Sequence, residues 1–179
     1  MTPLTQSLVE QLSFKLLAKG WMLSCAESCT GGLIAAACTD LAGSSRWFER
    51  GFVSYSNASK VELLGVDPSL IAAHGAVSQE VARAMALGAL THSAAQVSLS
   101  VTGVAGPTGG SADKPVGCVW FGWALASELE EEPEEGLEGE SAVKGPRLTS
   151  ERMDFAGTRE AVRAQTVEHA LGRLLQLLP

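Results

Sequence analysis

The chain has 179 residues, enough for one domain of ordinary size, and 46% of them are hydrophobic, so it can build a substantial core. The net charge is −7, but eight of the twenty acidic residues are glutamates between positions 128 and 140, which leaves 12 acidic against 13 basic residues elsewhere. This composition excludes a basic nucleic-acid surface, and the longest uncharged apolar run, 116–126, is too short for a membrane helix of about 20 residues.

The N-terminus also lacks the basic and apolar regions of a signal peptide. We therefore expect a cytoplasmic protein made of a single domain, residues 1–179, with no membrane partner and no direct nucleic-acid partner. The acidic stretch, at about 128–145, is expected to be a solvated loop rather than an interaction tail.

The cysteines and histidines do not form a redox or metal-binding pattern. The four cysteines include no C-x-x-C pair, and the three histidines are too far apart in the sequence for a zinc motif. The residues in question are Cys25, Cys29, Cys38, Cys118, His74, His92 and His169. The sequence predicts reduced cysteines and no metal site.

Helix and strand signals alternate along most of the chain. Thr2 and Pro3 suit the start of a helix whose leucines recur every four residues until Gly20. A short apolar strand at 21–26 then leads through a small polar loop into a helix at 33–41.

The second half of the pattern is similar. Helices are expected after an Asn57 cap, after a Ser78 cap, and on the stripe formed by Val167, Leu171, Leu174 and Leu178. Further strands are expected at 51–56, 97–101, 116–126 and 147–155. This alternation predicts an α/β protein with helices on both faces of a sheet.

The loop Glu27–Gly32 is the first candidate site, because it joins the carboxyl end of a strand to the start of a helix. Backbone N–H groups at such a position stabilise an anion, either a phosphate or a developing oxyanion. Ser28 is well placed there as a nucleophile. The alternative is that Ser28 or Thr30 only caps the helix.

The loop Thr102–Gly110 is the second candidate, with four glycines in nine residues. It has neither the lysine of a P-loop nor the spacing of a dinucleotide fingerprint. It could admit a ligand phosphate against bare backbone, or it could be an ordinary connection.

A serine nucleophile needs a base, and no histidine lies near either loop in the sequence. If Asn57 caps its helix, Lys60 falls in the first turn, where the helix dipole lowers the pKa of an amine. Tyr55, the only tyrosine, could hold or relay a proton. The alternatives are a solvated lysine and a tyrosine at the boundary of the core.

Six short segments, taken in order, resemble the CinA C-terminal-domain family, whose enzymatic members are nicotinamide-nucleotide amidohydrolases. They are 26–32 (AESCTGG), 43–48 (GSSRWF), 55–57 (YSN), 75–78 (GAVS), 101–107 (VTGVAGP) and 114–117 (KPVG). Each segment is short, but together they span nearly the whole chain. The resemblance is to the stand-alone form, without the additional N-terminal domain of some members.

The resemblance implies a three-layer α/β/α sandwich with a mostly parallel mixed sheet of about five or six strands. It implies hydrolysis of the carboxamide of nicotinamide mononucleotide, a pyridine nucleotide, to nicotinate mononucleotide and ammonia, without a metal or other cofactor. A homo-oligomer is compatible with it. The implied catalytic residues are Ser28, Lys60 and Tyr55, and the implied substrate-binding residues are Thr30, Gly31, Gly32, Arg46, Thr102, Gly103, Gly106, Gly109, Gly110 and Arg159.

One departure is that Gly157-Thr158-Arg159 stands where the family often has Gly-Asp-Arg, although Thr158 can still cap the last helix.

Two alternatives to serine catalysis also remain. Cys29, next to Ser28, could be a thiol nucleophile. The protein could instead be a non-catalytic nucleotide-binding module, or a regulatory module associated with competence or DNA damage.

Overall fold

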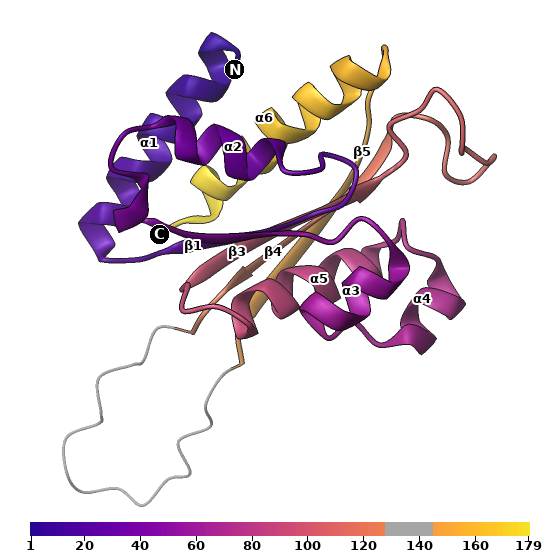
Figure 1. Ribbon diagram of the computed structural model, residues 1–179, viewed down its shortest axis with the longest axis horizontal. Helices are drawn as coiled ribbons and strands as arrows, with labels where there is room; N and C mark the ends of the chain where they lie inside the picture. Colours follow the sequence, from indigo (N-terminus) through magenta and orange to yellow (C-terminus); the bar gives the residue numbers. More distant parts are fainter. Residues whose placement is uncertain (128–144) are drawn as a thin grey trace, which may run out of the picture.

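The computed structural model describes residues 1–127 and 145–179 (Figure 1). Nearly all of the predicted acidic loop therefore lies outside the described residues. The described elements, in chain order, are α1 (Pro3–Lys19), β1 (Leu23–Glu27), α2 (Leu33–Asp40), the 3-10 helix η1 (Ser44–Arg46), β2 (Phe48–Val53), α3 (Asn57–Leu64), α4 (Pro68–His74), α5 (Gln79–Thr91), β3 (Val97–Gly103), β4 (Cys118–Leu125), β5 (Arg147–Asp154) and α6 (Arg159–Leu177).

The described strands form one mixed sheet of five strands in the order β2-β1-β3-β4-β5. β1 pairs in parallel with both β2 and β3, whereas β4 pairs antiparallel with β3 and β5. Of these five strands, four run in one direction and β4 runs against them. The expected mixed sheet is confirmed, with half of its pairings antiparallel.

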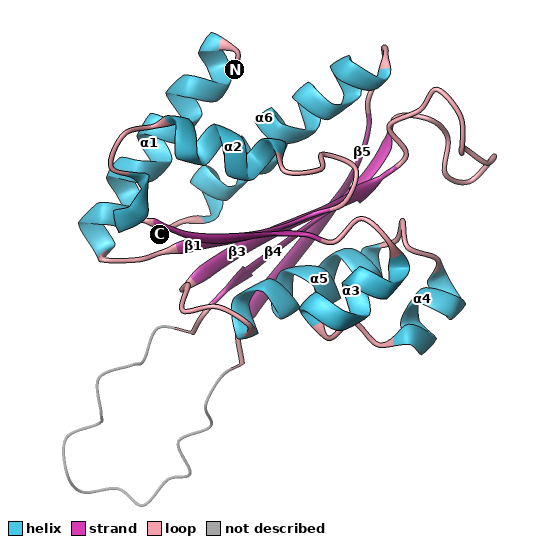
Figure 2. Cartoon of the chain, in the orientation of Figure 1, coloured by secondary structure: helices cyan, strands magenta, loops and turns pink. Residues whose placement is uncertain are grey.

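Helices cover both faces of the sheet, which confirms the α/β fold. In Figure 2, α1, α2 and α6 lie on one face and α3, α4 and α5 on the other. The larger apolar cluster lies on the first face and includes Leu12, Ile34 and Leu171. A smaller cluster on the second face includes Leu64 and Met85. The sheet is thus buried on both sides, and loops at its strand ends are free to form a site.

Three local expectations are corrected. β2 begins at Phe48 rather than at residue 51, because the charged pair Glu49–Arg50 on an edge strand obscures the apolar alternation. Ser56, not Asn57, caps α3, since its hydroxyl accepts the N–H of Ser59 at 3.0 Å. The short helix α4 was not expected, although an Asp cap followed directly by Pro68 is a helix-start signal.

Helix α5 is hydrogen-bonded to the sheet by three buried serines of β1 and β3. Their hydroxyls donate to helix carbonyls at 2.6 to 2.9 Å: Ser24 to Ala89, Ser98 to Ala86 and Ser100 to Ala82. Each buried hydroxyl is therefore satisfied without adding bulk between helix and sheet.

Glycines let backbones approach on both sides of this helix. A Cβ at Gly88 would collide with the backbone carbonyl of Leu64 in α3, and a Cβ at Gly122 would collide with the carbonyl of Ala82. α3, α5 and the sheet are consequently packed backbone against backbone.

Candidate active site

Ser28 and Lys60 meet at the carboxyl end of β1. Ser28 follows directly after β1, and Lys60 reaches it from α3, 32 residues later in the chain. Nζ of Lys60 lies 3.0 Å from Oγ of Ser28. Lys60 is 1% exposed and Ser28 is 8% exposed, so the contact is largely shielded from water.

The other two partners of the Lys60 amine are backbone carbonyls, those of Ser54 at 2.8 Å and Tyr55 at 3.3 Å. A carbonyl can only accept, so these two contacts use two N–H groups. A neutral amine has two hydrogens and one lone pair, and its lone pair then faces the hydroxyl of Ser28. An ammonium can donate to all three oxygens, and once it loses a proton the neutral amine can keep both carbonyl contacts and accept the serine proton.

Burial lowers the pKa of Lys60 to about 8 from its usual 10.5. The direction is the expected one, but the leading cause is desolvation and not the helix dipole. Because Ser56 is the cap, Lys60 is the fourth residue of α3, at the edge of the first turn, where the dipole has weakened.

The turn after Ser28 contains fewer free N–H groups than expected. The N–H of Gly31 donates to the carbonyl of Ser28 at 3.2 Å, and the N–H of Gly32 donates to the carboxylate of Glu27 at 3.0 Å. These two glycines are thus not available as oxyanion donors. Within the described part of the chain, the N–H groups of Cys29 and Thr30 donate to no other residue.

Glu27 and Arg163 hold this turn, and neither was identified from the sequence. The Glu27 carboxylate is 1% exposed and accepts three backbone N–H groups at the start of α2. Nη2 of Arg163 donates to the carbonyl of Thr30 at 2.7 Å. An acid just before a helix is a recognisable signal. Arg163 carries no comparable signal, because it lies 133 residues after Thr30.

Thr30 is fully buried, and its hydroxyl has no hydrogen-bond partner among residues 1–127 and 145–179.

Tyr55 contacts the Ser28–Lys60 pair through its backbone carbonyl, which accepts from the Lys60 amine. Its side chain is 61% exposed and makes no hydrogen bond with any described residue. A proton relay through the tyrosine hydroxyl stays a prediction.

The second loop leaves the carboxyl end of β3, beside the Ser28 turn. Thr102 is buried, and its hydroxyl donates to the carbonyl of Ala76 at 2.8 Å. A Cβ at Gly103, Gly106 or Gly110 would meet atoms of residues 116–119 at 2.5 to 2.8 Å. These three glycines are therefore explained by packing. Only Gly109, with φ of +90° and its nearest neighbour at 3.9 Å, is open among the four.

The two predicted arginines lie in different places. Nη1 of Arg159 donates to the carbonyl of Gly106 at 2.9 Å, which ties the start of α6 to the second loop. Thr158 caps that helix, as expected. Arg46 precedes β2, whose residue Phe48 pairs with Leu23 at the amino end of β1. The structure therefore does not bring Arg46 to Ser28 within one chain.

The family of the chain follows from comparison with known proteins. A model of the CinA C-terminal domain matches residues 5–144. The chain belongs to the CinA C-terminal domain family. Its relatives in this family include nicotinamide-nucleotide amidohydrolase PncC of Enterobacter agglomerans, which is 51% identical over 166 residues, covering 93% of this chain and 90% of that protein.

Nicotinamide-nucleotide amidohydrolase PncC of Pseudomonas putida is 48% identical, covering 99% of this chain and 98% of that protein. The crystal structure of the competence/damage inducible protein CihA from Agrobacterium tumefaciens has a TM-score of 0.86 at 38% identity, covering 99% of this chain and 97% of that one. The family fold is thus shared along almost the entire length of these proteins.

Cys29 is a poor candidate nucleophile in this CinA-type site. It is 5% exposed, and burial raises the pKa of its thiol to about 12. A thiol with that pKa is protonated at neutral pH. The hydroxyl of Ser28, paired with Lys60, is the better-activated group.

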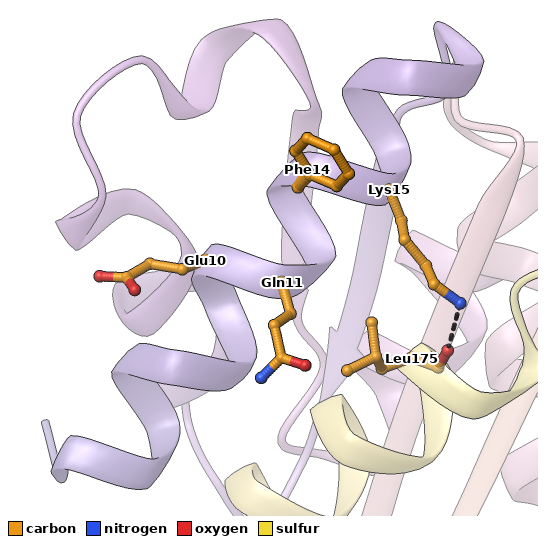
Figure 3. Close-up of a pocket in the computed structure, with 5 residues that line it drawn as sticks. All are labelled: Glu10, Gln11, Phe14, Lys15 and Leu175. Atoms are coloured by element: carbon orange, nitrogen blue, oxygen red, sulfur yellow. Dashed lines mark hydrogen bonds between the residues drawn. The ribbon is translucent and has the colours of Figure 1, made fainter.

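A groove between α1 and α6 is separate from this site. Figure 3 shows its lining, which consists of Glu10, Gln11, Phe14, Lys15 and Leu175. No predicted site residue lines it. In the described ranges, no group of three His, Cys, Asp or Glu side chains is arranged to hold a metal, and no helix is both long and apolar enough to cross a bilayer.

Proposed function

We propose that this protein is a nicotinamide mononucleotide amidohydrolase that releases ammonia and nicotinate mononucleotide in the cytoplasm. The observation that carries the proposal is the 3.0 Å contact between Lys60 Nζ and Ser28 Oγ, with the two amine hydrogens directed at carbonyls. The relatives named nicotinamide-nucleotide amidohydrolase support the choice of substrate.

The reaction begins with proton transfer. The lone pair of neutral Lys60 takes the Ser28 proton as Oγ attacks the carboxamide carbon. The carbonyl oxygen becomes an oxyanion, and its donors are the N–H groups of Cys29 and Thr30, which donate to no other described residue. The loss of one such donor typically costs about 3–4 kcal/mol of transition-state stabilisation.

The Lys60 ammonium then protonates the leaving nitrogen, and ammonia departs as the C–N bond breaks. Water attacks the resulting ester, again with Lys60 as the base, and Ser28 regains its proton. The sum is one amide and one water converted to one acid and one ammonia.

The nucleotide is proposed to lie across the carboxyl ends of β1 and β3. Gly109 offers open backbone in the second loop, and Arg159 lies at the start of α6 beside that loop. An arginine is a suitable partner for the phosphate. Tyr55, at the exposed edge of the Ser28–Lys60 pair, is proposed to contact the pyridine ring or the ribose.

The test is ammonia release from nicotinamide mononucleotide, related pyridine nucleotides, the nucleoside and free nicotinamide. Wild type should act on the mononucleotide, and Ser28→Ala should lose at least about 1,000-fold in kcat. Cys29→Ala is the matched control at the neighbouring position. Retention of most activity in Ser28→Ala would remove the nucleophile from the proposal.

One outcome would favour a different class of function. Structural relatives include a protein described as competence/damage inducible. Tight nucleotide binding without ammonia release from any of these amides would indicate a nucleotide-binding regulatory module instead.

A further inference from the structure

The turn that carries Ser28 is held from two sides by charged side chains. Glu27 holds its far end, accepting the N–H groups of Gly32, Ile34 and Ala35 at 3.0, 3.1 and 2.9 Å. Arg163 holds its middle, donating to the Thr30 carbonyl at 2.7 Å. The charges of both residues reach the Cys29 thiol in the same turn, where Glu27 raises and Arg163 lowers the pKa.

These contacts fix the orientation of individual peptide groups. A trans peptide is planar, with its C=O and N–H directed to opposite sides. In the peptide between Thr30 and Gly31, the carbonyl is bound by Arg163 and the N–H by the Ser28 carbonyl. That carbonyl of Ser28 is in turn held by Gly31, so the N–H of Cys29, in the same peptide, points the other way.

Glu27 also decides what the start of α2 can bind. The first N–H groups of a helix normally attract an anion. Here a buried carboxylate already occupies three of them. A substrate phosphate or oxyanion would meet like charge there, so the helix start is closed to both.

Arg163 bears a feature that packing alone does not explain. Its Nε is buried and has no hydrogen-bond partner among the described residues. A buried unsatisfied donor destabilises a fold, and such groups gather at functional sites. Among residues 1–127 and 145–179, the guanidinium makes one hydrogen bond, from Nη2 to the Thr30 carbonyl two residues after the nucleophile.

We propose that Glu27 and Arg163 are positioning residues for acyl transfer at Ser28, which hold the turn so that only the N–H groups of Cys29 and Thr30 face the oxyanion. This inference rests on the proposed function. It adds that Arg163 of α6 contributes to catalysis through the backbone of the turn, whereas Arg159 of the same helix is the residue proposed to meet the substrate.

The test uses Arg163→Met, the conservative Arg163→Lys, and Arg173→Met as a control on the same helix, where Arg173 lies on the surface beside Glu151. Arg163→Met should lower kcat about 10- to 100-fold with KM within about threefold, because misplaced donors act in the transition state. Arg163→Lys should regain part of kcat, since an ammonium can still donate to the Thr30 carbonyl. Arg173→Met should stay within about twofold.

Two kinetic results would overturn the assignment. An unchanged kcat in Arg163→Met removes the positioning role, and a change confined to KM makes Arg163 a substrate ligand. The pH profile of Arg163→Met adds a control. The inflection that Lys60 produces should stay at the same pH, while the rate is lower at every pH. If Arg163→Met does not fold, Arg163→Gln takes its place, because its side chain is too short to reach the Thr30 carbonyl: a lower kcat at an unchanged KM supports the role, and an unchanged kcat refutes it.

A second readout separates this inference from the proposed substrate. A small alkyl fluorophosphonate reacts with Ser28 by forming a phosphorus–oxygen bond and releasing fluoride, while the serine proton passes to Lys60; the same N–H donors serve its phosphoryl oxygen. If wild type labels without hydrolysing any amide, and Arg163→Met labels about tenfold more slowly, the amidase proposal fails and the positioning role stands. Equal labelling rates refute positioning, and a wild type that neither labels nor releases ammonia refutes both.

Discussion

The buried amine of Lys60 gives a pH dependence that can be worked out in advance. Burial lowers the pKa of this amine to about 8 from 10.5. At pH 7 about a tenth of the molecules then hold a neutral lysine, against about 0.03% for an unperturbed one. Desolvation therefore multiplies the population of competent base by about 300-fold.

The perturbation is pH itself, with kcat/KM for ammonia release measured from pH 6.5 to 9.5. The lower limit avoids the second ionisation of the substrate phosphate, near pH 6. We expect kcat/KM to rise about tenfold between pH 7 and 9 and to level off above pH 8 to 9. Lys60→Arg should be inactive across the range, because a guanidinium keeps its proton.

Lys15→Met is the control, since Lys15 donates to the carbonyls of Leu175 and Leu178 near the C-terminus and lines the separate groove. Its profile should match that of wild type. An inflection near pH 6.5 would indicate a histidine base. A flat profile, or a Lys60→Arg variant that follows wild type, would refute the reasoning outright.

Three further outcomes follow from burial and packing. Cys29→Ala should keep kcat/KM within about threefold, because a buried thiol with a pKa of about 12 is not the nucleophile; faster alkylation of Cys29 than of a free thiol would contradict this. Between pH 7 and 9.5 the unfolded chain binds the Lys60 proton more fully than the folded chain does, so raising the pH stabilises the fold. Denaturant unfolding should therefore show the free energy of unfolding of wild type rising by about 2 kcal/mol relative to Lys60→Met. If the difference between the two proteins does not change with pH, the pKa of Lys60 is not shifted. Gly88→Ala should cost about 1–3 kcal/mol because its Cβ meets the backbone of Leu64. Gly172→Ala, with 3.7 Å of clearance, should instead gain up to about 1 kcal/mol in the same unfolding assay, and equal effects would refute the packing argument.

The sequence was sufficient to predict most of the elements, with α4 as the missed helix, because their signals are local. The caps at Thr2, Ser78 and Thr158 lie where they were expected. The apolar stripe of the last helix is buried as its spacing required, and β4, an interior strand of the sheet, is buried along almost its whole length. The edge strand β2 was misplaced because an edge strand need not alternate.

The sequence predicted only part of the site, because the availability of each N–H group depends on which acceptor lies next to it in the folded chain. The pairing of Ser28 with Lys60 was a hypothesis that the structure now supplies with a distance. The predicted oxyanion donors Gly31 and Gly32 were already engaged, one of them by a carboxylate whose direction no spacing reveals. Glycines that looked like a ligand loop mostly make room for the following strand.

The serines beneath α5 also affect the distance between base and nucleophile. They set the height of α5 above the sheet, Gly88 brings the backbone of α3 against α5, and α3 carries Lys60. The 3.0 Å between Nζ and Oγ therefore depends on main-chain contacts among α3, α5 and the sheet, in addition to the Lys60 side chain. Serines and glycines that do not touch the reacting atoms thus help to set the spacing on which proton transfer depends.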